Sequence, residues 1–170
     1  QEVETWTPID KLVAAKWKRM RILPSPLTSN SEFLRRVQMD LIGLPPDPEA
    51  ISTFLADDRP IQEKRATIID ALIDSPEFVD HWTNKWADLL RPNPYRVGIK
   101  AVWMLDAWLR EAFRENKPYD QFVRELVTAR GSSWRNGATV IFRARPLTVA
   151  IASSVSQMSV SYTHLRAPET

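Results

Sequence analysis

Apolar residues recur at three- and four-residue spacings along most of the chain, which is the period of an amphipathic α-helix. No two alternating runs are joined by hairpin-turn residues, so the pattern predicts no strand pair. Ser, Thr or Asp followed by Pro marks several helix starts, because such side chains cap exposed amides and proline fits the first helical position. The pattern predicts helices over residues 8–20, 29–41, 47–55, 61–74, 76–90, 99–114, 118–130 and 147–158.

The residues that follow these segments are suited to ending helices. Gly43 and Gly131 tolerate the left-handed backbone that terminates many helices, and Asn116 can adopt it as well. Residues 139–142 fit either a short extended piece or a buried turn, since periodicity cannot decide over four residues. We therefore predict an all-α fold, a single compact domain of about seven or eight helices with a Trp-rich core.

The composition narrows the classes of function. The 170 residues carry 23 Lys and Arg against 21 Asp and Glu, so neither nucleic acid nor an anionic membrane surface is an expected partner. The absence of cysteine excludes disulfides, thiolate zinc sites, iron–sulfur clusters and covalent haem attachment through Cys-x-x-Cys-His. No apolar run reaches the roughly 18 residues of a membrane span, and the first ten residues lack the layout of a signal peptide.

One pair of side chains has the spacing of metal ligands. Glu77 and His81 stand four residues apart in a predicted helix, which places them on one face. Two ligands do not make a site, and the nearby Asp80, Lys85 and Asp88 favour a solvated polar face. We predict no metal-binding residue.

The seven tryptophans are the most unusual feature of the composition. Trp82 and Trp86 lie one helical turn apart, and aromatic faces at this spacing could flank a haem or a sugar ring. Both share an apolar stripe with Phe78 and Leu89, so packing into the core is the favoured interpretation. We predict no cofactor-binding residue.

A third candidate pairs Tyr119 with Asp120 as an acid and a base. The alternative is mechanical, because Asn116 can end one helix, Pro118 can begin the next, and Asp120 in the first turn complements the helix dipole. The mechanical interpretation is favoured, and we predict no catalytic residue.

Several long segments carry a family resemblance. Residues 34–57, LRRVQMDLIGLPPDPEAISTFLAD, resemble the hallmark segment of a family of uncharacterised domains in planctomycete-type cytochrome-c-associated proteins. Residues 70–91 resemble that family's Trp-rich helix, residues 107–129 its Asn-x-Pro-Tyr-Asp-x-Phe segment, and residues 136–143 its Asn-x-Ala-x-x-Phe loop. The resemblance implies an exported protein, periplasmic or extracellular, with a large multidomain architecture and a haem-bearing domain as partner.

The chain departs from the family pattern near its end. The family continues towards a Cys-x-x-Cys-His element suited to haem c, and this chain has none. Residues 159–170, SVSYTHLRAPET, resemble translated sequencing-adapter sequence, so His164 carries no weight. We expect a helical domain over residues 1–158, a non-native tail over residues 159–170, and no cofactor in this chain, with haem c held by the full-length protein.

Three functions follow from these observations. The favoured one is a non-catalytic structural or docking module beside a haem c segment. The second is part of a cell-surface hydrolase or oxidoreductase whose site needs the missing C-terminal region. The third is a carbohydrate- or partner-binding module, for which a groove containing Trp6, Trp17 or Trp134 would be the distinguishing feature.

Overall fold

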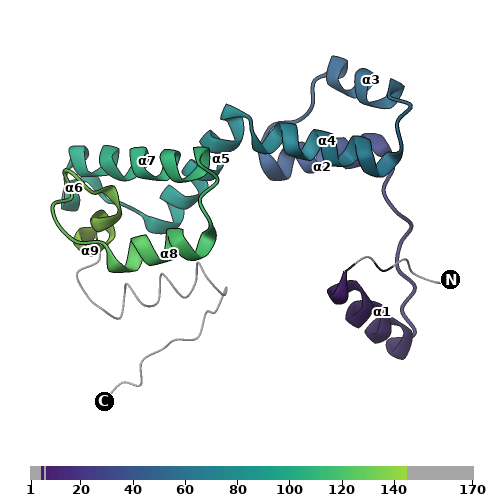
Figure 1. The fold of residues 1–170 in the computed structure, drawn as a ribbon, viewed down its shortest axis with the longest axis horizontal. Coiled ribbons are helices and arrows are strands. Elements are labelled where there is room, and N and C mark those ends of the chain that lie inside the picture. Colours follow the sequence, from purple (N-terminus) through teal and green to yellow (C-terminus); the bar gives the residue numbers. More distant parts are fainter. Residues whose placement is uncertain (1–4, 6, 145–170) are drawn as a thin grey trace.

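The computed structural model describes residue 5 and residues 7–144, and this part of the chain contains helices and no strands (Figure 1). The prediction of an all-α fold is confirmed. The helix predicted over residues 147–158 lies outside the described residues. The elements are α1 (Pro8–Met20), α2 (Asn30–Leu41), α3 (Pro48–Ala56), α4 (Ile61–Ile73), α5 (Pro76–Leu90), α6 (Pro94–Val97), α7 (Ile99–Arg114), α8 (Tyr119–Thr128), the 3₁₀-helix η1 (Gly137–Thr139) and α9 (Val140–Ala144).

Short-range polar contacts set most helix starts. The hydroxyl of Thr7 accepts the amide of Asp10 at 3.2 Å, and the Asp10 carboxylate accepts the amide of Thr7 at 2.8 Å, which completes a capping box. Ser29, Asp47 and Ser75 cap α2, α3 and α5 through the side-chain oxygen alone, which accepts the amide three residues later.

Several helices end where a left-handed residue stands: Arg21 has φ 54° after α1, and Arg91 has φ 47° after α5. Gly43 has φ 72° after α2, and Asn116 has φ 46° after α7. Gly131 also has a positive φ, but α8 ends at Thr128, before the predicted boundary.

The main core lies where α5, α7 and α8 pack around η1 and α9. Its fully enclosed side chains are aliphatic, with Leu105 and Leu109 of α7 at the centre and Leu90, Leu126, Val140 and Ile141 around them. The tryptophans of the cluster, among them Trp86 and Trp108, are half-buried and pack onto this aliphatic centre from its edge.

Residues 139–142 are helical, so the buried-turn alternative of the sequence analysis holds and the extended one does not. Thr139 to Ile141 are buried beneath α7. A Cβ on Gly137 would lie 2.1 Å from the carbonyl oxygen of Met104, so the close approach of this turn to α7 requires glycine.

Helices α2, α3 and α4 form a second group, and α5 leads from this group to the main core (Figure 1). Leu34, Phe54 and Leu72 are its buried apolar residues. The rings of Phe33 and Phe54 stack with their centroids 6.2 Å apart.

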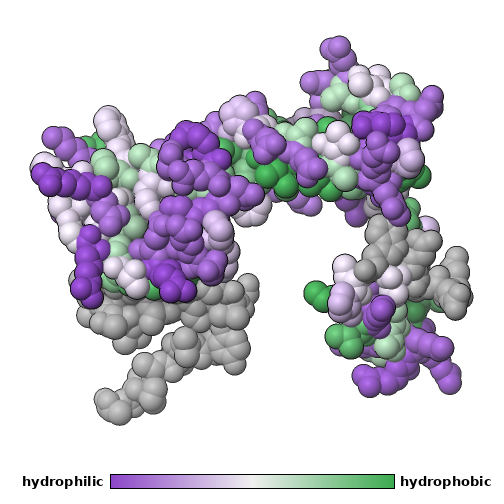
Figure 2. All heavy atoms as spheres, viewed as in Figure 1, coloured by the Kyte–Doolittle hydropathy of each residue, from purple (hydrophilic) through white to green (hydrophobic). Residues whose placement is uncertain are grey.

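Helix α1 stands apart from both groups at the end of the extended residues 22–29 (Figure 1). None of its residues is buried, and hydrophobic side chains lie on its surface (Figure 2). The apolar stripe predicted for this helix exists, but within the described part of the chain it buries no residue.

Candidate functional site

An aromatic pocket of about 320 Å³ opens between α5, the end of α7 and the start of α8. We call it the aromatic pocket. Ala112, Asn116 and Lys117 complete its lining, and its aromatic walls are Phe78, Trp82, Trp86, Phe113, Tyr119 and Phe122.

The pocket brings together two candidates that the sequence analysis treated separately. Trp86 meets Phe122 edge to face with centroids 4.7 Å apart, and Tyr119 at 6.4 Å. Trp82 lies one turn earlier, 6.0 Å from the ring of Phe78. Trp86 packs on the core, which was the favoured interpretation, and also lines this pocket.

One cation stands at the edge of the aromatic pocket. The ammonium of Lys117 pairs with a carboxylate oxygen of Glu125 at 2.8 Å and lies 5.8 Å from the ring centre of Trp108. The bond from Lys117 lowers the pKa of Glu125, and a second bond from Gln121 acts in the same direction. This pairing holds Lys117 beside the aromatic walls with its charge balanced.

The indole N–H of Trp82 is buried without a hydrogen-bond partner among the described residues. A buried donor in this state costs about 1 to 3 kcal/mol. The ammonium of Lys85 lies 5.0 Å from the ring centre of Trp82.

Glu77 and His81, the pair with metal-ligand spacing, lie in different surroundings. Glu77 is exposed, whereas His81 is partly buried with its ring against Gly43. Burial, with a smaller contribution from Lys85, lowers the pKa of His81. Within the described residues, no three His, Asp or Glu side chains gather in a way that could hold a metal ion.

Tyr119 and Asp120 lie at the start of α8, where Asp120 is exposed and stands in the first turn. Tyr119 is 49% exposed and turns its ring to Trp86. Asn116 ends α7, Pro118 is the N-cap residue of α8, and this geometry matches the mechanical interpretation.

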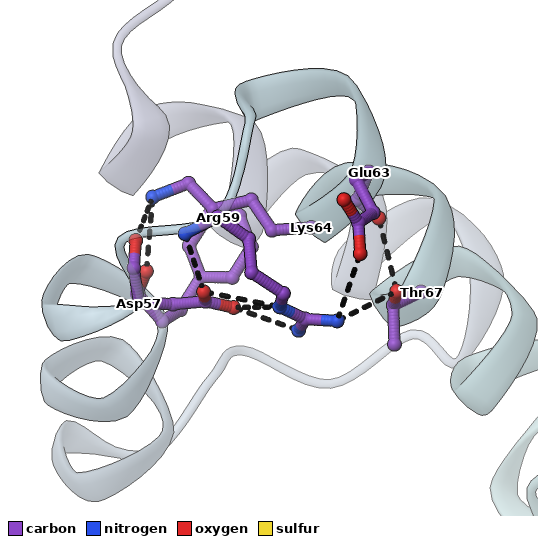
Figure 3. Close-up of polar contacts among 6 residues, drawn as sticks. Asp57, Arg59, Glu63, Lys64 and Thr67 are labelled. Carbon is purple, nitrogen blue, oxygen red and sulfur yellow. Dashed lines mark hydrogen bonds and ion pairs between the residues drawn. The ribbon is translucent and has the colours of Figure 1, made fainter.

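A polar cluster that the sequence did not predict lies at the end of α3 (Figure 3). The guanidinium of Arg59 pairs with the carboxylate of Asp57 at 2.7 Å and donates to the hydroxyl of Thr67 at 3.3 Å. Bonds from Arg59 hold the pKa of Asp57 at about 2, below its ordinary 3.8. Glu63 stands 3.9 Å from the other side of the same guanidinium.

Lys64 belongs to this cluster and is only 5% exposed. Its ammonium donates to the carbonyls of Asp57 at 2.9 Å and Phe54 at 3.3 Å, which belong to the last turn of α3 and its C-cap (Figure 3). The cluster therefore caps α3 and joins it to α4. The sequence feature that could have indicated this cluster is the position of Lys64 in the first turn of α4, just after the short connection from α3.

A second depression of about 540 Å³ contains Trp134, the residue that the sequence analysis named for a binding module. Trp134 is 62% exposed and Tyr95 is 98% exposed. Trp17 is half-buried on α1, and Trp6 lies outside the described residues. Trp134 therefore lies in a depression of the described surface.

These observations define the class of protein: an all-α domain with an aromatic pocket, an aromatic surface depression and a helix that lies apart. The chain belongs to the PSCyt2 family, described as a protein of unknown function (DUF1549), whose profile matches residues 8–166. No curated protein and no solved structure matches the chain significantly. Within the described residues, no helix is both long and apolar enough to cross a lipid bilayer.

The matched span reaches residue 166 and so includes part of the segment expected to be non-native. That boundary, at residue 158, stays a prediction.

Proposed function

We propose that this chain is a non-catalytic docking module of a larger exported protein, and that α1 packs against a neighbouring segment of that protein. The observation that carries the proposal is the unpartnered apolar face of α1. Ile9 is 70% exposed and Leu12 is 74% exposed, and Val13 and Met20 extend the same stripe. Helices of this length owe most of their stability to burying such a stripe against another element.

The apolar surface continues into the linker that follows α1. Ile22, Leu23 and Leu27 are all exposed, the last two to about four-fifths of their surface. Apolar patches that extend over neighbouring residues mark interaction surfaces in soluble proteins, whereas scattered single residues do not. Helix and linker together offer a partner a continuous strip to bury.

The resemblance over residues 34–57 and 107–129 supports the finer part of the proposal. On this basis the partner segment is a haem c domain of the same planctomycete-type protein, which is periplasmic or extracellular. The haem attaches to the Cys-x-x-Cys-His element expected beyond residue 158, and this chain itself binds none.

Limited trypsin digestion of the full-length protein tests the docking. Lys16, Lys18, Arg19 and Arg21 provide cleavage sites in and just after α1. If a neighbouring segment covers α1, these bonds should be cut at least about tenfold more slowly in the full-length protein than in the 170-residue chain. Equal cleavage rates would contradict the proposal.

A charge placed on the apolar stripe sharpens the test. Leu12→Glu in the full-length protein should restore fast cleavage, because it buries a charge at the interface. Ala15→Glu adds the same charge to the same helix at an exposed position of small size and serves as the matched control. Protection that survives Leu12→Glu would show that another surface makes the contact.

Two measurements test the haem part of the proposal. Sequencing the locus across codon 158 should reveal an uninterrupted reading frame that leads to a Cys-x-x-Cys-His element, and a native stop codon there would disprove it. Adding haem to the purified 170-residue chain should give no saturable shift of the Soret band. A saturable shift would mean that this chain holds haem itself.

Carbohydrate binding is a second candidate function, favoured by one observation. Trp134 and Tyr95 are exposed aromatic rings that line the same depression. Flat, exposed aromatic rings of this kind suit contact with sugar rings through apolar faces and polar edges.

A further inference from the structure

Two segments at one end of the molecule concentrate positive charge. Residues 91–105 span α6 and the start of α7, residues 129–144 span η1 and α9, and the two segments pack together at the end away from α2, α3 and α4 (Figure 1). Of the 23 Lys and Arg in the chain, six lie in these segments and 17 elsewhere, whereas all 21 Asp and Glu lie elsewhere. This end of a nearly neutral protein therefore carries Lys and Arg without Asp or Glu, as does the separate stretch of residues 11–31 with its five Lys and Arg.

The six cations are exposed, and within residues 7–144 no carboxylate lies within 4.0 Å of any of them. We call them the basic end: Arg91, Arg96, Lys100, Arg130, Arg135 and Arg143. Some cations elsewhere, such as Arg110 and Lys117, are paired with acids, whereas others, such as Lys11 of α1, form no ion pair among the described residues. The basic end therefore keeps its charge available to a partner.

The depression that contains Trp134 lies within the basic end. Arg96, Lys100 and Arg143 line it together with the exposed rings of Tyr95 and Trp134. Its lining contains no acidic residue. Aromatic faces and cations therefore converge on one depression with a volume of about 540 Å³.

Two contacts hold these groups in place without a ligand. The ammonium of Lys100 lies 5.2 Å from the ring centre of Trp134, a cation–π distance. The guanidinium of Arg143 donates to the hydroxyl of Ser133 at 2.7 Å, and Ser133 is 6% exposed. A guanidinium fixed by one bond to a buried hydroxyl still has donors left for an anion.

We propose that this depression binds an acidic polysaccharide, with Tyr95 and Trp134 packing on sugar rings and Arg96, Lys100 and Arg143 binding carboxylate or sulfate groups. The inference rests on the second candidate function and names its ligand class. Aromatic faces bind sugar rings through apolar contact, and the cations select acidic over neutral chains by charge-assisted hydrogen bonds.

Charge distribution favours a polysaccharide over single-stranded nucleic acid. Nucleic-acid grooves track a backbone that carries a phosphate on every nucleotide, so their basic surface must be long. Here the basic end is short, and outside it the chain has 17 basic against 21 acidic residues, which would repel a continuing phosphate backbone. A polysaccharide with acidic groups on some of its units avoids that repulsion.

Calorimetric titration of the full chain with four probes tests the inference. Dextran sulfate and dextran differ by the sulfate groups alone, polygalacturonate supplies carboxylates, and an oligothymidylate represents nucleic acid. We expect both acidic glycans to bind at least about tenfold more tightly than dextran. Their affinity should fall as the salt concentration rises, because salt screens the attraction between exposed charges, with a screening length of about 10 Å at 0.1 M.

Substitutions separate the depression from general positive charge. Trp134→Ala should weaken binding of dextran sulfate at least about fivefold, whereas Trp103→Ala, at an exposed tryptophan outside the depression, should not. The double variant Arg96→Gln/Lys100→Gln should weaken binding of dextran sulfate more than the control double variant Lys11→Gln/Lys16→Gln on α1. Both double variants remove two exposed cations, so their net charges are equal.

Each outcome has a distinct meaning. Equal binding of dextran and dextran sulfate, lost in Trp134→Ala, would overturn the acidic-ligand inference and leave the carbohydrate-binding candidate standing. Binding of the oligothymidylate alone would overturn both in favour of nucleic acid. Binding of acidic glycans that is insensitive to Trp134→Ala would reduce the effect to unspecific charge attraction and overturn the site, and so would no binding at all.

Discussion

At the scale of single residues, Gly43 and Gly131 share a left-handed backbone but differ in how closely other atoms approach them. Both have a positive φ, 72° and 100°. A Cβ on Gly43 would lie 2.3 Å from Nδ1 of His81, whereas nothing lies within 4 Å of one on Gly131. Gly43 therefore serves two purposes, the left-handed end of α2 and the close packing of α2 on α5.

Gly43→Ala should accordingly be more destabilising than Gly131→Ala. The left-handed backbone alone costs an L-residue about 1 to 2 kcal/mol, and this is the cost expected for Gly131→Ala. Gly43→Ala adds the displacement of the His81 ring, an overpacking cost of about 1 to 3 kcal/mol. Urea denaturation of both variants measures the difference, and equal losses would show that His81 moves away freely.

His81 should make stability depend on pH. Burial lowers its pKa below the ordinary 6.5, so the folded state favours the neutral ring. The stabilising contribution is fully present above about pH 6.5 and is lost as the pH falls towards the lowered folded pKa. Protonation would place a charge at the junction of α2 and α5, whose charged neighbour Lys85 repels it.

The free energy of unfolding should therefore fall as the pH drops below about 6.5, before most carboxylates titrate. In His81→Gln this fall should be largely absent, and Lys85→Gln should keep a reduced version of it because burial is the larger cause. Urea denaturation at several pH values measures the slope. An unchanged slope in His81→Gln would contradict the argument.

At the scale of elements, most helix starts could be predicted from the sequence and some helix ends could not. Ser29, Asp47 and Ser75 act on amides three residues away, so a local pattern suffices to identify them. The end of α8 at Thr128 was missed, because no local residue marks it. The same limit applies to Arg36, which has an acid four residues away on either side, Glu32 and Asp40, and pairs with Glu32.

The candidate sites required the fold. Trp82 and Trp86 could be placed on one stripe from the sequence, but Tyr119 and Phe122 come from a helix more than thirty residues later. The depression with Trp134 likewise joins residues 95–101 to residues 134 and 143. Sequence periodicity describes one helix at a time and cannot predict which helices will line the same pocket.

The joint between α3 and α4 depends on Lys64, because α3 has no left-handed residue at its end. Lys64→Met should cost about 1 to 3 kcal/mol, since it keeps the apolar stem but leaves the carbonyls of Phe54 and Asp57 without their donor. Lys11→Met, at an exposed lysine of α1, is the matched control and should change stability by less than about 0.5 kcal/mol. Thermal or urea unfolding measures both, and a neutral Lys64→Met would mean that water replaces the ammonium.

At the scale of the whole molecule, the stability of the chain should not depend on α1. None of its residues is fully buried, and the segment that follows it is tied to α4 by the bond from Arg65 to the carbonyl of Thr28 at 3.1 Å. Deleting residues 1–27 keeps that contact and removes the helix with most of its linker. The free energy of unfolding should change by less than about 0.5 kcal/mol, the range of substitutions at exposed positions.

Leu34→Ala in the undeleted chain is the positive control, which should show that the same unfolding measurement detects a loss of stability. Leu34 is 1% exposed in the group of α2, α3 and α4, and such a truncation costs about 2 to 5 kcal/mol. A comparable loss from deleting residues 1–27 would mean that α1 contributes to the body of this chain, and the docking proposal would fail with it. The docking proposal requires unchanged stability, because α1 can bury its apolar face against a partner only if that face is not already buried within this chain.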